Sequence, residues 1–452
     1  MKKTNFSRRK FISTISTGSL AAVVSTNLPT FGKITNGPNQ LAILGGEAVR
    51  RNKSWPEWPY VDEKMVDAVV NTTRSGIWSR IQSQTGTVLT FEKEFAQLLG
   101  TNYAIGTGSG TQALSTCVEA LGIGAGDEVI TSPYTDMGTI SSILMSRALP
   151  VMADLDPESY QMDPDDIERK ITKNTKAIMP VHIMGYSCDM ERIMDIASRH
   201  DLKVIEDACQ AALAEYQGKK LGTIGDLGCF SFQASKVISC GEGGAIVGND
   251  QELMDKCYAV QNRGADRQGR NAVIGTKYRM NEFEGAILMG QMPGVKERFD
   301  RREENANYLT SRLKDFPGVV PQKVYEGNES GAHYKYAMSY RKEHFNDAER
   351  SKFLQAVRAE GVALSGYIAN GLHREPWTDY ILNLNVYQKM YSPSRLREYR
   401  NELSCPNCDK ITDEEMLVLN GPGPLLGTRE DMDDIVDAIL KVYENRDKLE
   451  TI

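Results

Sequence analysis

Lys236 is the residue of this sequence best suited to covalent chemistry. It lies in the segment 231–245, SFQASKVISCGEGGA, between an apolar run that ends at Phe232 and the glycine-rich turn 241–244. This pattern predicts a buried strand just before the lysine. A lysine held there and partly desolvated can lose its proton near neutral pH and attack a carbonyl carbon. Because a lysine beside a turn is more often a solvated surface residue, the hypothesis depends on the rest of the chain.

A glycine-rich segment, GTGSGT at 106–111, leaves a predicted strand and opens a predicted helix. The free backbone N–H groups of Ser109, Gly110 and Thr111, together with the helix dipole, would favour a phosphate there. The segment lacks the spacing of the ATP-type P-loop and of the dinucleotide motif, so it indicates a different phosphate. The alternative is an ordinary glycine-rich turn from strand to helix.

Asp207 ends another predicted buried strand, in the segment VIEDACQA at 204–211. A carboxylate in that position needs a hydrogen-bond donor or a cation. Gln210 follows about one helical turn later and would offer an amide on the same side. The alternative is that Asp207 caps the next helix.

These features fit one ligand, a phosphorylated aldehyde with a basic ring nitrogen. The phosphate would lie on residues 109–111, Asp207 would keep the ring nitrogen protonated, and Lys236 would hold the aldehyde as an imine. Pyridoxal 5′-phosphate has this chemistry, and its protonated ring is an electron sink for an adjacent carbanion.

The elements that must position these residues alternate between short apolar runs and amphipathic segments from residue 103 to about 250. This alternation predicts an α/β fold with a mainly parallel sheet, helices on both faces, and ligands at the carboxyl ends of the strands. We expect a large domain over 41–299, which includes an N-terminal arm, and a smaller α+β domain over 300–452. The expected strands span 103–106, 128–131, 150–154, 177–181, 203–206, 228–232 and 245–247, and the expected helices of this region span 111–121, 139–147, 164–171 and 190–200.

A helix predicted over 281–298, bent at Pro293, leads into the smaller domain. There we expect a strand near 336–341, a helix near 347–360, a long irregular stretch through Pro376, and a final amphipathic helix over 429–443.

The first 35 residues differ from the rest of the chain. Arg8 and Arg9, in SRRKFI, form a twin-arginine pattern followed by a short apolar stretch. This predicts an export signal over 1–35 and a periplasmic protein, and the alternative is a disordered basic N-terminus on a cytoplasmic protein. The formal net charge of −7 argues against a nucleic-acid binder.

Among the eight cysteines, only Cys405 and Cys408 have suggestive spacing. Buried free thiols are the favoured interpretation. A local disulfide after export is the next alternative, and zinc has the least support because no second pair or histidine cluster accompanies them.

From about residue 41 to the C-terminus, the chain resembles the DegT/StrS family of sugar aminotransferases, which depend on pyridoxal 5′-phosphate and have the type I aminotransferase fold. The segments that carry the resemblance are FEKEFA at 91–96, SGT at 109–111, PVHIMG at 180–185, IEDACQA at 205–211, SFQASK at 231–236, GEGG at 241–244 and YRM at 278–280.

The resemblance implies a role for each of the residues above. Lys236 would be the Schiff-base lysine and general acid/base, Asp207 the partner of the pyridine nitrogen, and Gln210 a ligand near the ring hydroxyl or the substrate. It also implies a homodimer in which the second subunit completes the active site. The residues implied to bind the phosphate are Gly110, Thr111 and Ser231.

Two positions depart from the family pattern. Where the family usually stacks an aromatic residue on the cofactor ring, this chain has Asp136, which cannot stack, so either Tyr134 or no residue takes that role. Asp136 would bind a hydroxyl or an ammonium group, or would cap the following helix. Lys277 stands where the family has an asparagine that reaches the phosphate across the dimer, and it would bind phosphate as a point charge or face solvent.

Two histidines are candidate substrate contacts through the resemblance. His182 lies in PVHIMG, and His373 lies in GLHREP at 371–376, which is similar to the family's segment near the substrate. The alternative for His373 is an exposed loop residue. The segment LLGTREDM at 425–432 is similar to the branch of the family that acts on cyclitols and aminoshikimate-type compounds.

The function we expect is transfer of an amino group from an amino acid such as glutamate or glutamine to a keto-sugar or keto-cyclitol. Family relatives that dehydrate sugars carry histidine in place of the lysine, so Lys236 favours transamination. Asp136 is the reason to keep a second hypothesis, another reaction of the same cofactor such as dehydration, deoxygenation or oxidative deamination. A third hypothesis is a sensor that binds the cofactor without turnover.

Overall fold

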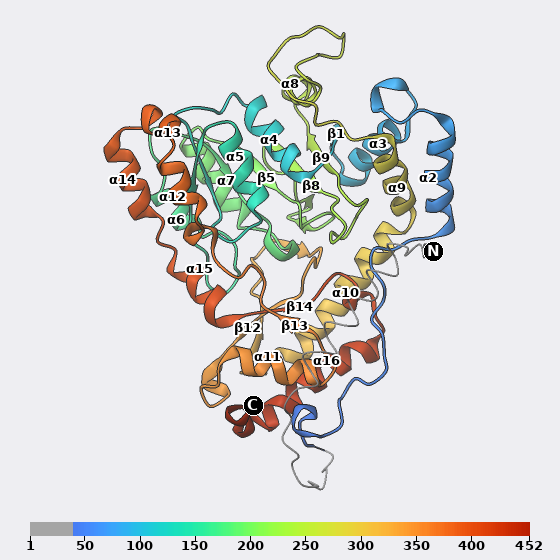
Figure 1. Cartoon of the computed structure of the whole chain (residues 1–452), viewed down its shortest axis with the longest axis vertical. Coiled ribbons are helices and arrows are strands. Elements are labelled where there is room, and N and C mark those ends of the chain that lie inside the picture. The colour runs from blue at the N-terminus through green and yellow to red at the C-terminus, as the bar shows by residue number, and fades with distance from the viewer. Residues whose placement is uncertain (1–38) are drawn as a thin grey trace, which may run out of the picture.

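The computed structural model describes residues 39–452 (Figure 1). The predicted twin-arginine signal lies outside the described residues. Within residues 39–452, no helix combines the length and the apolar character needed to cross a membrane.

A seven-stranded sheet with the order β1-β9-β8-β5-β4-β2-β3 forms the centre of the larger half. The strands from β8 to β3 are parallel to their neighbours, and β9 alone runs antiparallel, to both β1 and β8. The predicted mainly parallel sheet is confirmed. The strands are β1 (Tyr103–Thr107), β2 (Glu128–Thr131), β3 (Leu149–Met152), β4 (Thr175–Met179), β5 (Lys203–Asp207), β8 (Leu227–Ser231) and β9 (Gly244–Gly248).

Helices cover both faces of this sheet. Val129 of β2 belongs to the hydrophobic core on one face, and the next residue, Ile130, belongs to the core on the other. Because both faces are apolar, the strands read as continuous apolar runs in the sequence. One face carries α4 (Gly110–Ala120), α5 (Met137–Met145) and α8 (Gln251–Gln261), and the other carries α3 (Thr87–Leu99), α6 (Pro164–Arg169), α7 (Met190–Arg199) and α9 (Glu282–Gln291).

The carboxyl ends of three strands meet at one edge of the sheet. β1, β5 and β8 run in the same direction, because β9 is antiparallel to both of its neighbours. β1 leads into α4, β5 ends at Asp207 and β8 ends at Ser231. Lys236 lies in the loop that joins β8 to β9. The fold thus gathers the predicted chemical residues at the edge where α/β proteins bind ligands.

A four-stranded antiparallel sheet, in the order β10-β12-β14-β13, forms the centre of the smaller half and has its own hydrophobic core. The expected boundary after residue 299 falls inside α10, which continues from one half into the other. A small sheet of β6, β7 and β11 was not expected from the sequence. The elements are β6 (Glu215–Tyr216), β7 (Lys219–Lys220), α10 (Val295–Leu313), β10 (Val319–Pro321), β11 (Asn328–Ser330), β12 (Ala337–Tyr340), α11 (Arg350–Ala359), β13 (Leu364–Ser365), β14 (Met416–Leu419) and α16 (Arg429–Glu444).

Pro293 interrupts the single bent helix that the sequence predicts over 281–298. α9 ends at Gln291, and a short 3₁₀ turn, Met292–Gly294, joins it to α10. Proline has no backbone N–H and its ring crowds the preceding turn, so a helix breaks more readily at that position. The break lets α10 turn toward the smaller sheet.

Three helices that the sequence did not predict follow the irregular stretch expected through Pro376. They are α12 (Trp377–Leu382), α13 (Asn385–Met390) and α14 (Pro393–Glu402), and they lie beside the β3 edge of the large sheet (Figure 1). Tyr391 donates a hydrogen bond of 2.7 Å to the carbonyl of Asp127, and Arg395 forms an ion pair of 2.7 Å with the buried carboxylate of Glu128. Chain from the C-terminal third therefore covers the edge of the large sheet.

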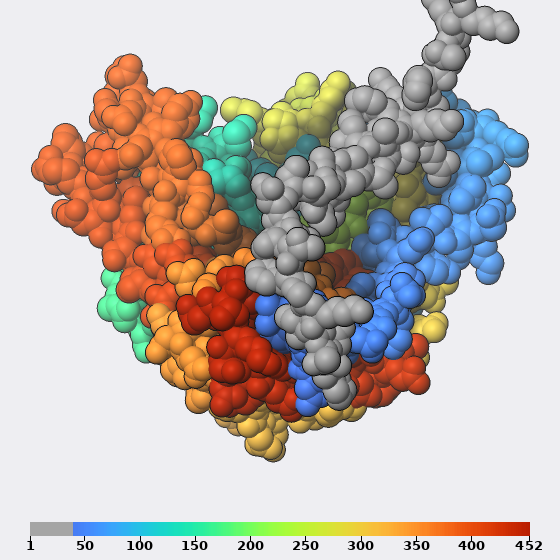
Figure 2. Space-filling view, turned by 60° about the horizontal axis from the view of Figure 1, so that its bottom comes forward, coloured from blue at the N-terminus to red at the C-terminus, as the bar shows by residue number. Residues whose placement is uncertain are grey.

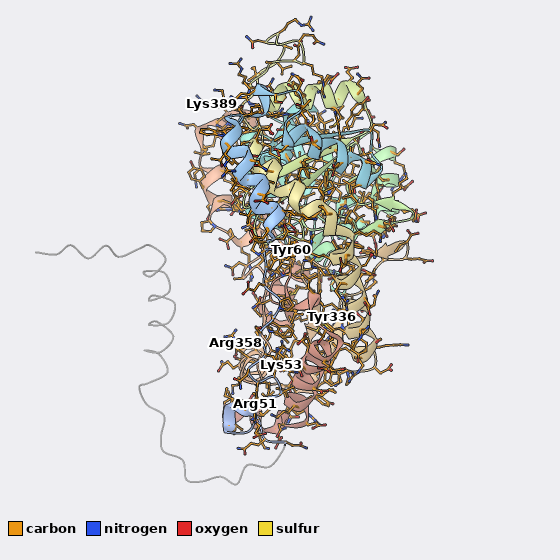
Figure 3. All side chains as sticks on the ribbon, turned by 90° about the vertical axis from the view of Figure 1, so that its right-hand side faces the viewer. Arg51, Lys53, Tyr60, Tyr336, Arg358 and Lys389 are labelled. Carbon is orange, nitrogen blue, oxygen red and sulfur yellow. The ribbon has the colours of Figure 1, made fainter. Side chains whose placement is uncertain are left out.

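The N-terminal arm connects the two halves. Leu41 is part of the core of the smaller half, and Arg50 forms ion pairs with Asp431 (2.6 Å) and with a second carboxylate of α16. In Figure 2 the arm, in blue, lies directly beside the red C-terminal segments. Farther along, the Trp58 indole donates to the carbonyl of Ala234 at 3.1 Å, two residues before Lys236. Figure 3 shows the same course, with Arg51 far from the large sheet and Tyr60 close to it.

Candidate active site

A cavity of about 450 Å³ lies at the meeting point of the strand ends. It is enclosed by the ends of β1, β5 and β8, the start of α5, the loop around Lys236 and two tyrosines from the smaller half. Lys236 is the single basic residue among the described residues that line it. Those residues are Ser109, Gly110, Thr111, Leu114, Thr135, Asp136, Gly138, Thr139, Val181, Asp207, Cys209, Gln210, Ser231, Gln233, Ser235, Lys236, Glu242, Tyr334 and Tyr367.

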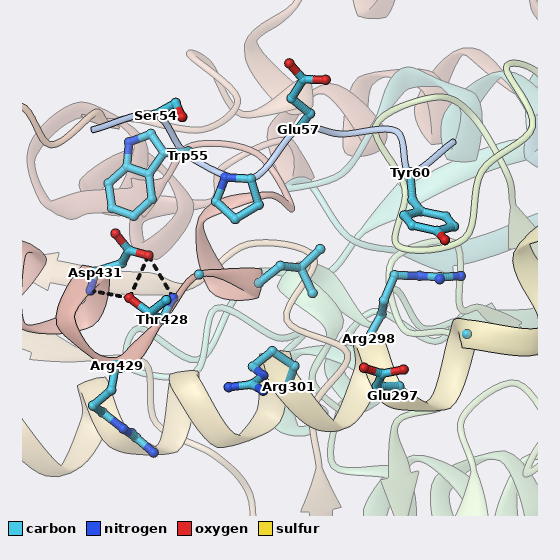
Figure 4. A pocket seen from close by; sticks show the side chains of 14 residues that line it. Ser54, Trp55, Glu57, Tyr60, Glu297, Arg298, Arg301, Thr428, Arg429 and Asp431 are labelled. Carbon is cyan, nitrogen blue, oxygen red and sulfur yellow. Dashed lines mark hydrogen bonds between the residues drawn. The ribbon is translucent and has the colours of Figure 1, made fainter. Parts of the chain in front are cut away.

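A larger cavity of about 900 Å³ lies elsewhere, between the arm, α10 and the start of α16 (Figure 4). Its polar groups are largely paired with one another: Asp431 accepts the backbone N–H of Thr428 at 2.7 Å, and the Arg298 guanidinium lies 4.7 Å from the centre of the Tyr60 ring. None of the predicted site residues lines it, so the chemistry belongs to the smaller cavity.

One end of the smaller cavity has the form of a phosphate site. Ser109 is the N-cap of α4, with its hydroxyl accepting the backbone N–H of Gln112 at 3.2 Å, and Gly110 and Thr111 begin the helix. A Cβ on Gly110 would lie 2.8 Å from the Ser231 Cβ and 2.9 Å from the Cys209 Sγ. Only glycine therefore lets the helix approach the end of β8 this closely, and the N–H groups of its first turn face an anion-sized space.

Asp207 lines the same cavity. Its side chain is almost fully buried, with 4% of the residue exposed. The Thr139 hydroxyl donates to Oδ2 at 2.7 Å and the Cys209 amide donates to Oδ1 at 3.2 Å, and Thr139 is itself bonded to Thr135 at 2.7 Å. Both partners among the described residues are neutral. A buried carboxylate is costly unless a cation pairs with it, so we expect a bound ligand to supply a positive charge beside Asp207.

Gln210 lies beside Asp207 in the cavity wall. Its Oε1 accepts the backbone N–H of Met184 at 2.8 Å, and its Nε2 donates to the Tyr367 hydroxyl at 3.2 Å. The amide is thus oriented by the protein, with one N–H still available to a ligand.

Lys236 also lines the cavity. Its Nζ lies 4.3 Å from the centre of the Tyr334 ring, and its backbone is held by a hydrogen bond of 2.8 Å to the Gln233 carbonyl. Burial raises the pKa of Tyr334, but the Lys236 ammonium, a hydrogen bond to Ser235 and the charge of Lys335 lower it, and the result lies below the ordinary value of tyrosine. The positive charge of Lys236 therefore acts on the adjacent Tyr334 hydroxyl.

Asp136 lies at the rim of the cavity and caps α5. Its Oδ1 accepts the backbone N–H of Gly138 at 2.8 Å, which is the alternative that the sequence left open. Tyr134 is fully buried and does not line the cavity; its hydroxyl donates to the Tyr367 carbonyl, so the ring is part of the core rather than a stacking surface at the site.

Three further predicted residues are not brought to the cavity. His182 is fully buried, accepts the Cys188 N–H at 3.2 Å through Nδ1 and bonds the buried Glu206 at 2.9 Å through Nε2, so both ring nitrogens are engaged and its predicted substrate contact is corrected. His373 is buried against Asp409 at 2.9 Å, and burial lowers the pKa of its imidazole. Lys277 is exposed on the surface of the single chain.

The sequence interpretation missed Thr139, Ser235, Tyr334 and Tyr367, all of which line the cavity. Ser235 directly precedes Lys236, so its place in the sequence alone could have identified it as a residue near the site. Thr139 lies in the first turn of α5 and is recognisable only once β2 and β5 are known to be near neighbours. The two tyrosines come from the smaller half and carry no local motif.

Comparison with known proteins decides the family. The model of the DegT/DnrJ/EryC1/StrS aminotransferase family matches residues 59–419. The chain belongs to this family. It is an aminotransferase with the type I fold that depends on pyridoxal 5′-phosphate, as the sequence resemblance implied.

Curated relatives and solved structures agree with the family. The chain is 32% identical to the L-glutamine:2-deoxy-scyllo-inosose aminotransferase of Streptomyces kanamyceticus, over 90% of this chain and 98% of the relative. It is 31% identical to the enzyme of the same name from Streptoalloteichus tenebrarius, over 91% and 99%. The crystal structure of 3-amino-5-hydroxybenzoic acid (AHBA) synthase superposes with a TM-score of 0.75 at 26% identity, covering 87% of this chain and 99% of that one.

The cavity fits the family's cofactor. The buried Asp207 carboxylate lacks a cation among the described residues, which a protonated pyridine nitrogen would supply, and the glycine-dependent start of α4 leaves room for a phosphate. Lys236 lines the same cavity. The residues that would hold the cofactor are Ser109, Gly110, Thr111, Asp207, Ser231 and Lys236.

Replacing Gly110 with alanine tests the phosphate end. The new methyl group would meet Ser231 and Cys209 below 3.0 Å, so we expect binding of pyridoxal 5′-phosphate to weaken about tenfold or more, the size of effect that overpacking produces. The measurement is an absorbance titration of cofactor-free protein. Gly124→Ala is the control, because its Cβ would meet only the Ser146 carbonyl at 3.5 Å. Equal affinity of the Gly110→Ala variant and the wild type would refute this assignment.

Proposed function

We propose that this aminotransferase transfers the amino group of L-glutamine or L-glutamate to a keto-cyclitol, with keto-sugars as the wider substrate class. The observation that carries the proposal is that Lys236, Asp207 and the N-terminus of α4 line one cavity. The names of two relatives, both L-glutamine:2-deoxy-scyllo-inosose aminotransferases, support the donor and the acceptor class.

Each residue would contribute a separate part of the reaction. Bound here, pyridoxal 5′-phosphate supplies the electron sink for a carbanion. Asp207 holds the ring nitrogen in its protonated form, and Thr139 fixes the carboxylate that does so. The Lys236 Nζ takes the proton from the donor Cα and returns a proton to the carbon that receives the amino group.

The polar wall of the cavity suits a hydroxylated ring. Asp136, Gln210 and Glu242 offer acceptors and donors in a space of about 450 Å³, and two tyrosines close it on the side of the smaller half. Few precisely placed polar groups in a concave site are the usual basis of small-molecule specificity. We assign Asp136 to a substrate hydroxyl, in addition to its cap on α5.

We also propose that the enzyme is a homodimer whose second subunit completes the site. The N-terminal helix α2 (Glu63–Ser75) and its flanks expose apolar side chains, among them Val61 (63% exposed), Trp78 (51%) and Ile81 (59%). Apolar clusters of this kind on a surface mark interfaces. Light scattering of the purified protein is expected to give twice the mass of one chain; a monomer that remains active would contradict the proposal.

Export by the twin-arginine route is a further proposal that rests on Arg8 and Arg9. Folded, cofactor-loaded proteins suit this route. Fractionation of cells that express the full chain is expected to find it in the periplasm, and a variant with both arginines changed to lysine should remain in the cytoplasm. An unchanged distribution of that variant would exclude the route.

Lys236→Ala tests the central assignment. With L-glutamine and 2-deoxy-scyllo-inosose as substrates, we expect the rate of amine formation, measured by mass spectrometry of the product, to fall by about 100- to 10,000-fold, the usual worth of a general acid/base. Lys219→Ala, at an exposed position of β7, is the control and should keep the wild-type rate. A Lys236→Ala enzyme of wild-type rate would overturn the proposal, as would a dehydrated product in place of an amine.

A further inference from the structure

The smaller half closes the cavity with a wall of two tyrosines. Tyr334 precedes β12 and Tyr367 follows β13, and both line the cavity. Their rings meet edge to face, with centroids 6.3 Å apart at 73°. Tyr334 is the ring that touches the reactive lysine.

The face of the Tyr334 ring lies 4.3 Å from the Lys236 Nζ. An aromatic face attracts a cation within about 6 Å of its centre, and the attraction grows when water is excluded. Tyr334 is 5% exposed, so this contact belongs to the desolvated class. Lys335 lies 5.3 Å from the centre of the same ring, which adds a second positive charge to its surroundings.

Ser235, the residue next to Lys236, fixes the position of the Tyr334 ring. The Ser235 hydroxyl donates to the Gln233 Oε1 at 2.7 Å, so it accepts the Tyr334 hydroxyl at 2.9 Å. The Ser235 backbone N–H also donates to the Gln233 Oε1, at 2.8 Å. Ser235, the residue before Lys236, therefore holds the Tyr334 ring over the Lys236 nitrogen.

We infer that Tyr334 is a positioning residue for Lys236: its ring face holds the nitrogen of the lysine, in its charged form, over the cavity, and Ser235 holds the ring. The inference rests on the proposed function, because it concerns the nitrogen that joins the cofactor. A freed Lys236 side chain has several rotatable bonds, and a ring that binds its charged end keeps it in reach of the carbon atoms between which it moves a proton.

The test compares Tyr334→Phe, which keeps the ring, with Tyr334→Leu, which removes it. The readout is the pH at which the visible absorbance of the cofactor-loaded resting enzyme changes. Since the ring favours the charged nitrogen, its removal should lower this midpoint by about one pH unit, equivalent to a tenfold change in the proton equilibrium. The phenylalanine variant keeps the ring and loses only its hydrogen bond to Ser235, so its midpoint should shift much less than that of the leucine variant. Asp136, Asp207, Glu242, Tyr367 and Lys335 surround the same region and stay unchanged in both variants.

A second measurement separates position from folding. On mixing with L-glutamine, the single-turnover loss of visible absorbance should slow about tenfold in Tyr334→Leu and about twofold at most in Tyr334→Phe. If Tyr334→Leu does not fold, Tyr334→Met replaces it with a side chain that fills the space better. Equal midpoints in the wild type and the ring-less variant would overturn this inference alone. A wild type that binds no cofactor would overturn the proposed function, and this inference with it.

Discussion

The site depends on one electrostatic requirement: the buried carboxylate of Asp207 needs a positive charge beside it. Asp207 ends a buried strand, and among the described residues its oxygens meet only a threonine hydroxyl and a backbone amide. Such a group is costly to bury unless a positive charge completes it. The protonated ring of pyridoxal 5′-phosphate supplies that charge, so the fold of this enzyme and the binding of its cofactor satisfy one electrostatic requirement together.

The architecture places the other groups around that carboxylate. Parallel β1, β5 and β8 bring a helix N-terminus, Asp207 and Ser231 to one edge, and the reversal of β9 creates the loop that carries Lys236. The smaller half supplies Tyr334 and Tyr367, and the N-terminal arm bonds the backbone of Ala234 in the lysine loop through Trp58. The cavity is therefore built from three parts of the chain that lie far apart in the sequence.

The residues at strand ends could be predicted from the sequence, because a buried apolar run followed by a polar residue or a glycine turn is a local signal. All seven strands of the large sheet, Asp207 and Lys236 were found in this way. Contacts between distant segments carried no such signal. α12 and α13 have six residues each and α14 buries only Tyr399, so none of them shows a clear apolar period. Tyr334 reaches the site only through the docking of the smaller half. The predicted substrate contact of His182 was wrong for the same reason: its ring bonds Glu206 of the neighbouring strand, and the sequence gives no local signal for that contact.

The most direct test of this account is to locate the lysine that joins the cofactor. The purified enzyme would be reduced with borohydride, digested and mapped by mass spectrometry. The account predicts that the mass of the reduced cofactor appears on the peptide that contains Lys236 and on no other. Attachment at a different lysine, or bound cofactor that leaves every lysine unmodified, would contradict it.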